Sequence, residues 1–371
     1  MRVCFLSCFP YPGMSSTAYY GYSQELARQG ADVTVVSAYL APHRSNAGLQ
    51  RTREGDVEVC KLPVTTFVKK SLAPTRFALQ AFSLIDQLQR ENPFDVLQPQ
   101  AFPNLGLVLY PTGRIPKVTV LDIRTSAISG GFLNTVSKLV LRLQARLFEH
   151  VIVLDRHLAT FLFDDRQRQV TIVPLGANFR QFRPGRGELR QRQFGLPPGD
   201  LVFIYTGNID AVRTVDKMVR AFTAVAQEHP HIRLLLLGEG DQRQHLQSLV
   251  EKRGLSHRVT FTGIVPYAEI PSYLQAADVG VAYVPDKVQY RNQPPLKTVE
   301  YLATGLPVLA TDTPGNRRFV LPGRNGLLAE DTVEALADSL TRLVEERELR
   351  QEMAQDARES VRPFSYEQIV R

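Results

Sequence analysis

The fold of this chain is decided by one stretch, Pro294-Pro295-Leu296-Lys297-Thr298-Val299-Glu300-Tyr301-Leu302-Ala303-Thr304-Gly305-Leu306-Pro307-Val308-Leu309-Ala310. Two prolines are tolerated in the first turn of a helix, where the N–H groups that they lack have no internal partner, and Gly305 with Pro307 stops a helix. Apolar residues recur at helical spacing between these limits and predict a buried face. The stretch therefore predicts one short, sharply bounded helix followed by a short buried strand at residues 307–310.

Glu300 brings a carboxylate near the start of this predicted helix. The start of a helix favours anions, and a carboxylate beside a bound anion needs hydroxyl groups as partners. This combination predicts a site for a ribose diol next to a diphosphate.

The stretch resembles the nucleotide-sugar-binding helix of family 4 glycosyltransferases, in which an E-x7-E motif precedes a sequence of the form A-x-G-x-P-V. Glu300 matches the second Glu of that motif, and Asn292 stands in place of the first. The resemblance implies that Glu300 binds the ribose hydroxyls and that Asn292, Pro295 and Leu296 also lie at the donor. It also implies that the carboxylate that contacts the donor sugar in the family is missing here.

The rest of the chain alternates between strand-like and helix-like segments. Strands are predicted at residues 2–7, 32–37, 57–62, 95–98, 117–121, 150–154, 170–173, 201–206, 232–237, 258–261 and 278–283. Helices are predicted at residues 15–29, 75–91, 135–149, 215–227, 241–253, 332–346 and 349–361. This alternation predicts an α/β protein with parallel, doubly wound sheets. The resemblance implies GT-B architecture, with two Rossmann-like domains that face each other across a cleft.

Residues 179–199 are rich in Arg, Gln, Gly and Pro without periodicity, which predicts a linker. We therefore expect an N-terminal Rossmann-like domain in residues 1–178 and a C-terminal one in residues 200–360. The resemblance implies that the first binds the acceptor and the second binds the nucleotide sugar. It also implies that residues 361–371 cross back to the first domain.

The loop after the first strand of the second half contains candidate phosphate ligands. Family members usually have G-R-L-x-x-x-K here; this chain keeps Gly207, has Asn208 for the Arg, and has Arg213 for the Lys. A guanidinium suits a phosphate because its planar fork donates two parallel hydrogen bonds. Arg213, helped by Lys297 and the helix start, is predicted to stabilise the charge of a departing diphosphate. The alternative is a surface arginine before a helix.

Three other loops follow predicted strands and match loops of the family. The resemblance implies that Gly238 and Gly240 form a G-x-G that faces the diphosphate. It implies that Ile264 and Val265 lie in a loop that meets the nucleobase. It also implies that Gly13, Met14 and Ser15 lie in a first loop that approaches the donor and the acceptor. Plain turns are the alternative for the glycine-containing loops. The first loop lacks G-x-G-x-x-G, which disfavours NAD(P).

Asp122 follows a predicted strand at a point where the family often has a His-Asp pair, and Leu121 replaces the His. Asp122 is a candidate for orienting substrate and Arg124 for taking an anion. Alternatively, Asp122 caps the next loop and Arg124 is a surface charge. The acidic pair Asp164-Asp165 is interpreted as a turn. No catalytic metal is expected, because cationic side chains and a helix end can neutralise the leaving group.

The composition is that of a soluble chain: 371 residues, 44% apolar and 22% charged, are enough for two domains. Cys4, Cys8 and Cys60 have no paired spacing, which predicts free structural thiols. No apolar run approaches the roughly 18–20 residues of a membrane span, so a cytoplasmic protein is expected.

Basic residues are concentrated in the first half. Residues 1–185 contain 21 Lys and Arg against 13 Asp and Glu, and residues 186–371 contain 23 against 24. Lys138, Arg142 and Arg146 recur every four residues on the predicted helix 135–149, next to an apolar stripe. Two interpretations follow: docking on an anionic membrane or acceptor, or a helix with a solvated basic face. No nucleic-acid partner is expected.

The resemblance implies a metal-independent, retaining glycosyltransferase, with a UDP- or GDP-sugar as co-substrate and no further cofactor. The acceptor hydroxyl would belong to a glycan, a glycolipid or a lipid-linked precursor. It also implies that the leaving phosphate oxygen takes the acceptor proton. Two alternatives remain: a sugar-nucleotide epimerase or hydrolase of the same fold, and a non-catalytic partner subunit, which the departures at Leu121, Asn208 and Asn292 favour.

Overall fold

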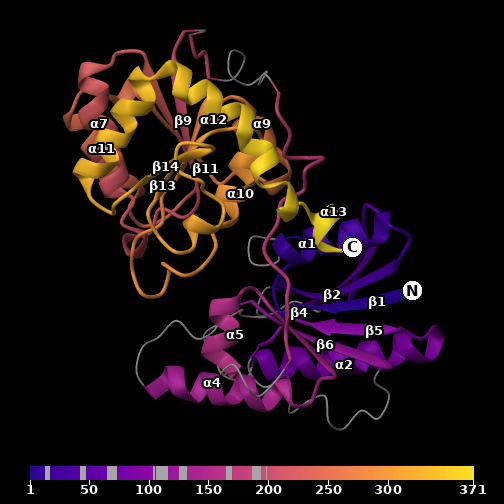
Figure 1. Cartoon of the computed structure of the whole chain (residues 1–371). Helices are drawn as coiled ribbons and strands as arrows, with labels where there is room; N and C mark the ends of the chain where they lie inside the picture. Colours follow the sequence, from indigo (N-terminus) through magenta and orange to yellow (C-terminus); the bar gives the residue numbers. More distant parts are fainter. Residues whose placement is uncertain are drawn as a thin grey trace. The chain divides into compact units, whose positions relative to one another are not determined.

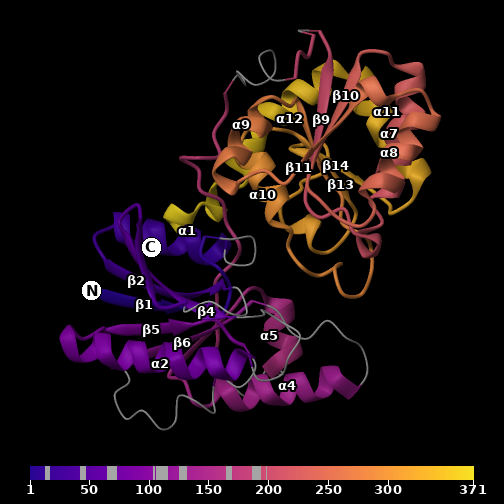
Figure 2. The same ribbon diagram turned by 180° about the vertical axis from the view of Figure 1, so that it is seen from behind.

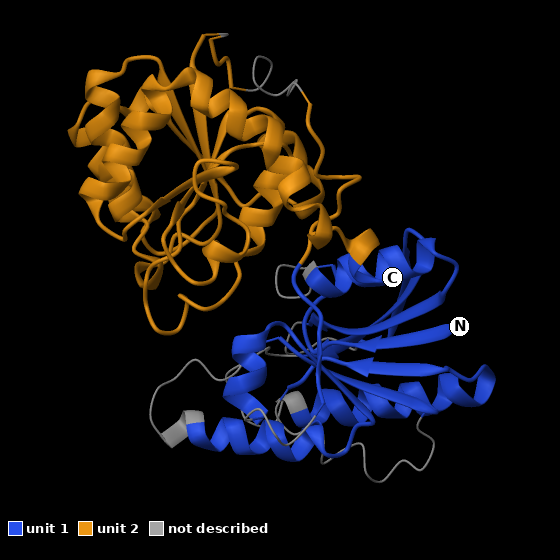
Figure 3. Cartoon of the chain, viewed as in Figure 1, with its two compact units in different colours: residues 1–175, 369–371 blue, residues 176–368 orange. Residues whose placement is uncertain are grey.

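The computed structural model describes residues 1–12, 17–41, 47–64, 73–102, 105, 116–124, 132–163, 169–185, 194–197 and 199–371. The chain divides into two compact units (Figure 3). Unit 1 contains residues 1–175 and 369–371, and unit 2 contains residues 176–368. Each unit is built on its own sheet, so the expected pair of α/β bodies is present.

Unit 1 contains an eight-stranded sheet with the order β3-β4-β2-β1-β5-β6-β7-β8 (Figure 1). Its strands are β1 (Arg2–Leu6), β2 (Asp32–Leu40), β3 (Gln50–Glu54), β4 (Val57–Val64), β5 (Val96–Pro99), β6 (Val118–Ile123), β7 (His150–Val153) and β8 (Thr171–Ile172). Its described helices include α1 (Thr17–Arg28), α2 (Ala73–Glu91), α4 (Phe132–Ala145) and α5 (Arg156–Phe163).

The edge strand β3 has no counterpart among the predicted strands. It pairs antiparallel with β4, whereas the other pairings of this sheet are parallel. Its sequence, Gln-Arg-Thr-Arg-Glu, contains no apolar residue, so hydrophobic periodicity gives no strand signal there. The charged residues of β3 suit an exposed edge, where they discourage pairing with another chain.

Helices cover both faces of the unit 1 sheet. On one face, the ring of Tyr19 from α1 packs edge-on against Phe5 of β1, with 5.3 Å between the ring centroids. On the other face, apolar residues of α2, α4 and α5 join one buried cluster with residues of β1, β2, β4 and β6. Unit 1 is therefore doubly wound, as predicted.

Unit 2 contains a six-stranded sheet with the order β11-β10-β9-β12-β13-β14, and its pairings are parallel. Its strands are β9 (Leu201–Thr206), β10 (Ile232–Leu237), β11 (Val259–Gly263), β12 (Val279–Ala282), β13 (Val308–Thr311) and β14 (Gly326–Ala329). Numbered from its first strand, this is the 3-2-1-4-5-6 order of a Rossmann sheet.

The helices of unit 2 lie on both faces of its sheet (Figure 2). They are α7 (Asp216–Glu228), α8 (Arg243–Lys252), α9 (Ile270–Gln275), α10 (Leu296–Ala303), α11 (Val333–Glu345) and α12 (Arg347–Ser360), and the short α13 (Tyr366–Ile369) spans the boundary between the two units. One buried cluster joins α7, α8 and α11 to the sheet, and a second joins α9 and α10.

The part of the chain that the structure describes has no helix with both the length and the apolar composition needed to cross a membrane.

Candidate functional site

The candidate site lies where the strand order of unit 2 reverses, between β9 and β12. Both strands run parallel, so their carboxyl ends meet at one edge of the sheet. Gly207 follows β9 and Tyr283 follows β12 at this edge. Ligands of open α/β sheets bind in the crevice that forms at such a reversal. Of the predicted donor residues, Gly207 and Asn208 follow β9 directly at this point.

The loops after β9 and β10 pack backbone against backbone. The N–H of Gly207 donates to the carbonyl of Leu237 at 2.9 Å, and the N–H of Ile209 donates to that of Glu239 at 3.0 Å. A Cβ added at Gly238 would lie 1.9 Å from the carbonyl oxygen of Gly207, and one at Gly240 would lie 2.4 Å from Ile209. Gly238 and Gly240 are therefore required by the close approach of the two loops.

Lys297 stands at the centre of the site. Its Nζ donates to the carbonyl of Tyr283 at 2.8 Å and lies 3.9 Å from the centroid of the Tyr205 ring. A Cβ built on Gly207 would lie 3.6 Å from the same Nζ. Lys297 thus joins α10 to the ends of both β9 and β12. Burial, reinforced by the charge of Arg213, lowers the pKa of Lys297 well below its ordinary value.

Arg213 lies at the end of a 3-10 turn, Ala211–Arg213, that follows the β9 loop. Its Cζ lies 4.3 Å from the centroid of the Tyr290 ring. The turn closes on Thr214, which has the left-handed φ of 46°. The charge of Arg213 lowers the pKa of Lys297, although less than burial does, because the guanidinium repels the protonated lysine. An anion placed between them would relieve that repulsion.

Glu300 is buried on α10, with 5% of its surface exposed. Its Oε1 accepts a hydrogen bond of 2.7 Å from the hydroxyl of Tyr267, in the turn after the β11 loop. Burial raises the pKa of Glu300 to about 8, and the Tyr267 hydrogen bond opposes that shift. A buried carboxyl whose oxygens accept from hydroxyl donors is suited to receive a diol.

The helix α10 begins directly after the two prolines, whereas the sequence predicts them within its first turn. Pro295 is the extended residue before the first turn, and Leu296 is the first helical residue. Thr298 donates to Oδ1 of the buried Asn316 at 2.8 Å, and Asn316 Nδ2 donates to the carbonyl of Thr311 at 2.8 Å. Asn316 therefore fixes the first turn of α10 to the end of β13.

The remaining predicted donor residues of unit 2 differ in exposure. Asn208 and Ile264 are exposed, and Val265 and Asn292 are half-buried. Val265 packs on the apolar cluster that contains α10. The hydroxyl of Tyr205 donates to the carbonyl of Asn208 at 3.2 Å. The roles predicted for these four side chains stay predictions.

Asp122 lies within β6 of unit 1 and is fully buried. Arg124 pairs with both of its carboxylate oxygens, at 2.6 Å and 2.9 Å. Arg124 also donates to the carbonyl of Val173 at 2.8 Å and to the hydroxyl of Tyr22 at 3.2 Å. The interpretation of Arg124 as a surface charge and Asp122 as a loop cap is therefore wrong, because both side chains sit inside one buried ion pair.

Some predicted residues lie outside the described part of the chain: Gly13, Met14, Ser15 and the pair Asp164-Asp165. Among the residues that are described, no group of three or more His, Cys, Asp or Glu side chains is arranged to hold a metal ion.

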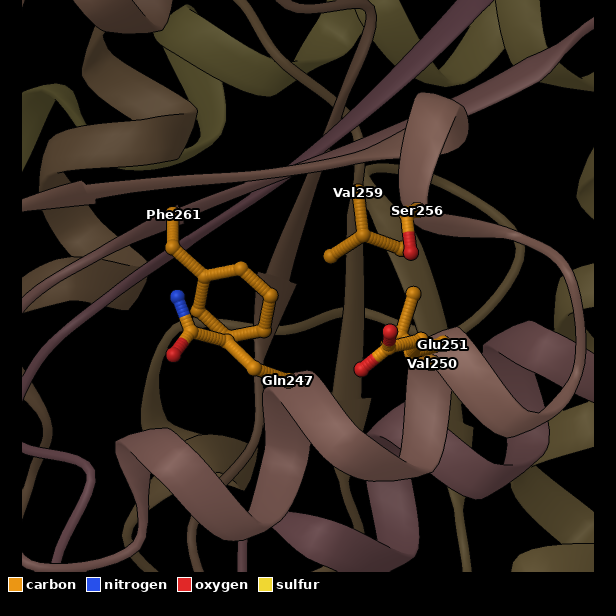
Figure 4. A pocket seen from close by; sticks show the side chains of 6 residues that line it. All are labelled: Gln247, Val250, Glu251, Ser256, Val259 and Phe261. Carbon is orange, nitrogen blue, oxygen red and sulfur yellow. The ribbon is translucent and has the colours of Figure 1, made fainter.

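A separate pocket of about 310 Å³ lies between α8 and the start of β11 (Figure 4). It is lined by Gln247, Val250, Glu251, Ser256, Val259 and Phe261. None of the predicted site residues lines it.

Sequence reasoning missed three residues that organise the site. Tyr267 is 33 positions from Glu300, and nothing in either local sequence links them. Asn316 is 18 positions from Thr298 and is equally invisible to local patterns. Tyr290 lies two positions before Asn292, and this nearness to a motif position was the one sequence signal that could have marked it as a site residue.

Residues 188–360 match the family model described as "Glycosyl transferases group 1". The D-inositol 3-phosphate glycosyltransferase of Nocardia farcinica (strain IFM 10152) is 31% identical over 219 residues, which are 57% of this chain and 47% of that relative. The alpha-monoglucosyldiacylglycerol synthase of Acholeplasma laidlawii is 24% identical over 338 residues, 85% of this chain and 82% of that one. The chain spans about half the length of the first curated relatives it matches.

Solved structures share the fold of the whole chain. Sucrose-phosphate synthase from Thermosynechococcus elongatus aligns with a TM-score of 0.75 at 19% identity, covering 100% of this chain and 96% of that one. Anabaena Alr3699/HepE in complex with UDP and glucose aligns with a TM-score of 0.70 at 18% identity, covering 100% and 97%. These likenesses confirm the expected fold of two Rossmann-like domains, and residues 188–360 of the chain are similar to the group 1 glycosyl transferases.

Proposed function

We propose that the chain is a retaining glycosyltransferase that moves a sugar from a nucleoside-diphosphate sugar to an acceptor hydroxyl. The observation that carries this proposal is the pair of cations at the reversal of the unit 2 sheet. Arg213 is held by the ring of Tyr290, and Lys297 by the carbonyl of Tyr283, so both are oriented before a ligand arrives. Like charges kept close together favour a ligand with two adjacent anionic groups, such as a diphosphate.

The ribose of the donor is assigned to Glu300. Its carboxyl lies on the same short helix as Lys297, three positions away, so one helix would hold both the diphosphate and the sugar attached to it. A protein of the same fold supports a nucleotide-sugar ligand, since Anabaena Alr3699/HepE was solved with UDP-glucose and with UDP. We infer a UDP- or GDP-sugar as the donor.

In the proposed reaction, the acceptor oxygen forms a bond to the anomeric carbon while the bond from that carbon to the diphosphate oxygen breaks. The electron pair of the broken bond stays on the diphosphate, whose growing charge Arg213 and Lys297 stabilise. The leaving phosphate oxygen takes the proton of the acceptor hydroxyl on the same face, which retains the configuration. In this scheme the two cations supply the charge neutralisation that a divalent metal supplies elsewhere.

The first test measures nucleotide binding by calorimetry with UDP, GDP and ADP. One nucleotide should bind the wild-type chain, and Arg213→Gln should weaken it by about tenfold or more, because a hydrogen bond to a charged group contributes about 1.5–3 kcal/mol. Glu300→Gln should also weaken binding, because the amide replaces one acceptor oxygen of the carboxyl with a donor. Arg324→Gln is the matched control, since Arg324 pairs with Asp356 on the exposed surface of the same unit. Equal affinity in all four proteins would remove Arg213 and Glu300 from the site.

The second test separates transfer from the alternatives. The preferred donor is incubated alone and then with glycan, glycolipid and lipid-linked acceptors, with and without EDTA, and the products are analysed by NMR. Transfer with retained anomeric configuration and no EDTA effect supports the proposal. Turnover of the donor alone would identify a hydrolase or an epimerase, and binding without any turnover would identify a non-catalytic subunit.

A further inference from the structure

The helix α4 of unit 1 exposes an apolar stripe to the outside. Val136, Leu139, Val140, Leu143 and Leu147 are each 39–57% exposed. Four of these residues lie in α4, and Leu147 lies in the turn that continues it, where its N–H donates to the carbonyl of Gln144 at 2.9 Å. Their spacing places them on one face of the helix. We call these five residues the α4 stripe.

The α4 stripe is not the side of the helix that packs on the sheet. That side consists of Leu141, Ala145 and Phe148, which are buried in the unit 1 core. The helix therefore has two apolar faces, and one of them contributes nothing to the described core. Figure 1 shows α4 on the outside of unit 1, with α5 beside it. A second apolar face of this size on a helix marks an interaction surface.

Basic residues border the α4 stripe on one flank. Lys138 lies 5.2 Å from the ring centroid of Phe161, Arg142 donates to the carbonyl of Leu162, and Arg146 is exposed. Within α4 and the turn that follows it, from Phe132 to Phe148, the sequence contains these three basic residues and no Asp or Glu. An apolar face next to basic side chains with long aliphatic stems is the pattern of a helix that lies in the surface of an anionic membrane.

We propose that unit 1 docks on an anionic lipid surface through the α4 stripe, with its basic flank on the lipid headgroups. The positive charge of Lys138, Arg142 and Arg146 favours an anionic lipid surface over other partners for the α4 stripe. A second copy of the chain seated on the same stripe would bring the same basic flank against or near itself, and like charges at an interface are unfavourable. Anionic headgroups complement the flank, while their acyl chains accept the leucines. The proposal concerns unit 1 and does not rest on the sugar-transfer activity.

The test is co-sedimentation of the full chain with vesicles of phosphatidylcholine alone and of phosphatidylcholine mixed with an equal amount of phosphatidylglycerol. The wild-type chain should sediment with the mixed vesicles and much less with the neutral ones. Leu139→Asn should lower the partition coefficient by about tenfold, because one buried leucine is lost. Arg146→Gln should lower it by about fivefold, and added salt should weaken the wild-type binding.

Leu79→Asn is the matched control, because Leu79 lies on α2 of the same unit and is 57% exposed, as Leu139 is. It should bind the mixed vesicles like the wild type, and circular dichroism should show all three variants folded. The proposal is overturned if the wild-type chain ignores the mixed vesicles, or if Leu139→Asn and Leu79→Asn behave alike. It is also overturned if ultracentrifugation shows a dimer that Leu139→Asn dissociates, since the stripe would then be an interface between copies.

Discussion

The hydroxyl of Tyr267 donates a 2.7 Å hydrogen bond to Oε1 of Glu300, in a site where that carboxyl is almost fully buried. The two residues come from different connections of unit 2, and their contact joins the turn after β11 to the helix α10. The hydrogen bond stabilises the ionised carboxylate, and burial opposes ionisation more strongly, so the pKa is raised to about 8.

Glu300→Gln should stabilise the ligand-free chain at high pH. The folded pKa of about 8 lies above the ordinary value of 4.5, so the folded state binds the extra proton and stability falls as pH rises between those values. The melting temperature of the variant should match that of the wild type near the low end of this window and exceed it by a few degrees above the upper end. The exposed Glu352→Gln should show no such divergence. Parallel curves for wild type and Glu300→Gln would contradict the buried carboxyl.

Lys297→Met should make nucleotide binding weaker and less dependent on pH. The pKa of Lys297 is lowered by burial and by Arg213, so the wild-type lysine loses its proton at a pH well below that of an exposed lysine. Affinity for the bound nucleotide, measured by calorimetry, should therefore drop in the wild type as pH rises. In the variant, which keeps the length of the side chain without the charge, this drop should be absent. If the affinity of Lys297→Met falls with pH as that of the wild type does, a group other than Lys297 causes the pH dependence.

Tyr290 should act on the nucleotide through Arg213. Tyr290→Leu removes the ring that lies 4.3 Å from the guanidinium, and nucleotide affinity should fall about two- to fivefold, since a cation–π contact at a partly exposed site contributes about 0.5–1 kcal/mol. Tyr290→Phe keeps the ring and should bind like the wild type. In the Arg213→Gln background the Tyr290→Leu change should have no further effect. A full effect in that background would show that Tyr290 contacts the ligand directly.

Asp122→Asn should destabilise unit 1. The change leaves Arg124 buried without its carboxylate, and breaking a buried pair in this way costs about 3–5 kcal/mol. Urea unfolding followed by circular dichroism should show an early transition that the wild type lacks. Glu54→Gln is the control, since Glu54 pairs with Lys61 at 3.9 Å near the surface of the same unit. An unfolding curve no different from that of the control would mean that the ion pair contributes little.

The sequence predicts the elements whose signals are local. The strands β9 and β10 begin and end at the predicted residues, because each is a mostly apolar run with turn-forming residues on both sides. The helix α10 ends at Ala303, two residues before the left-handed Gly305 with its φ of 86°. Prolines and glycines act on their own backbone, so their effect can be predicted without the rest of the fold.

Sequence-based predictions fail where the structure of a segment depends on contacts with residues far away in the sequence. The exposed strand β3 has no apolar residue, and its pairing with β4 alone makes it a strand. Helical periodicity finds one apolar stripe on α4, but only the packed structure shows that this stripe is exposed and that Leu141, Ala145 and Phe148 cover the sheet instead. Arg124 and Asp122 are two positions apart, and their mutual burial depends on Tyr22 and Val173 from other parts of unit 1.

The close approach of Gly238 to the carbonyl of Gly207 affects how variant libraries of this chain are to be interpreted. Every side chain larger than hydrogen at position 238 forces two connections apart, and the amount of correctly assembled protein then falls together with turnover. A loss of activity on substitution at position 238 therefore measures how well unit 2 folds. Only substitutions that leave yield untouched while abolishing turnover report on chemistry.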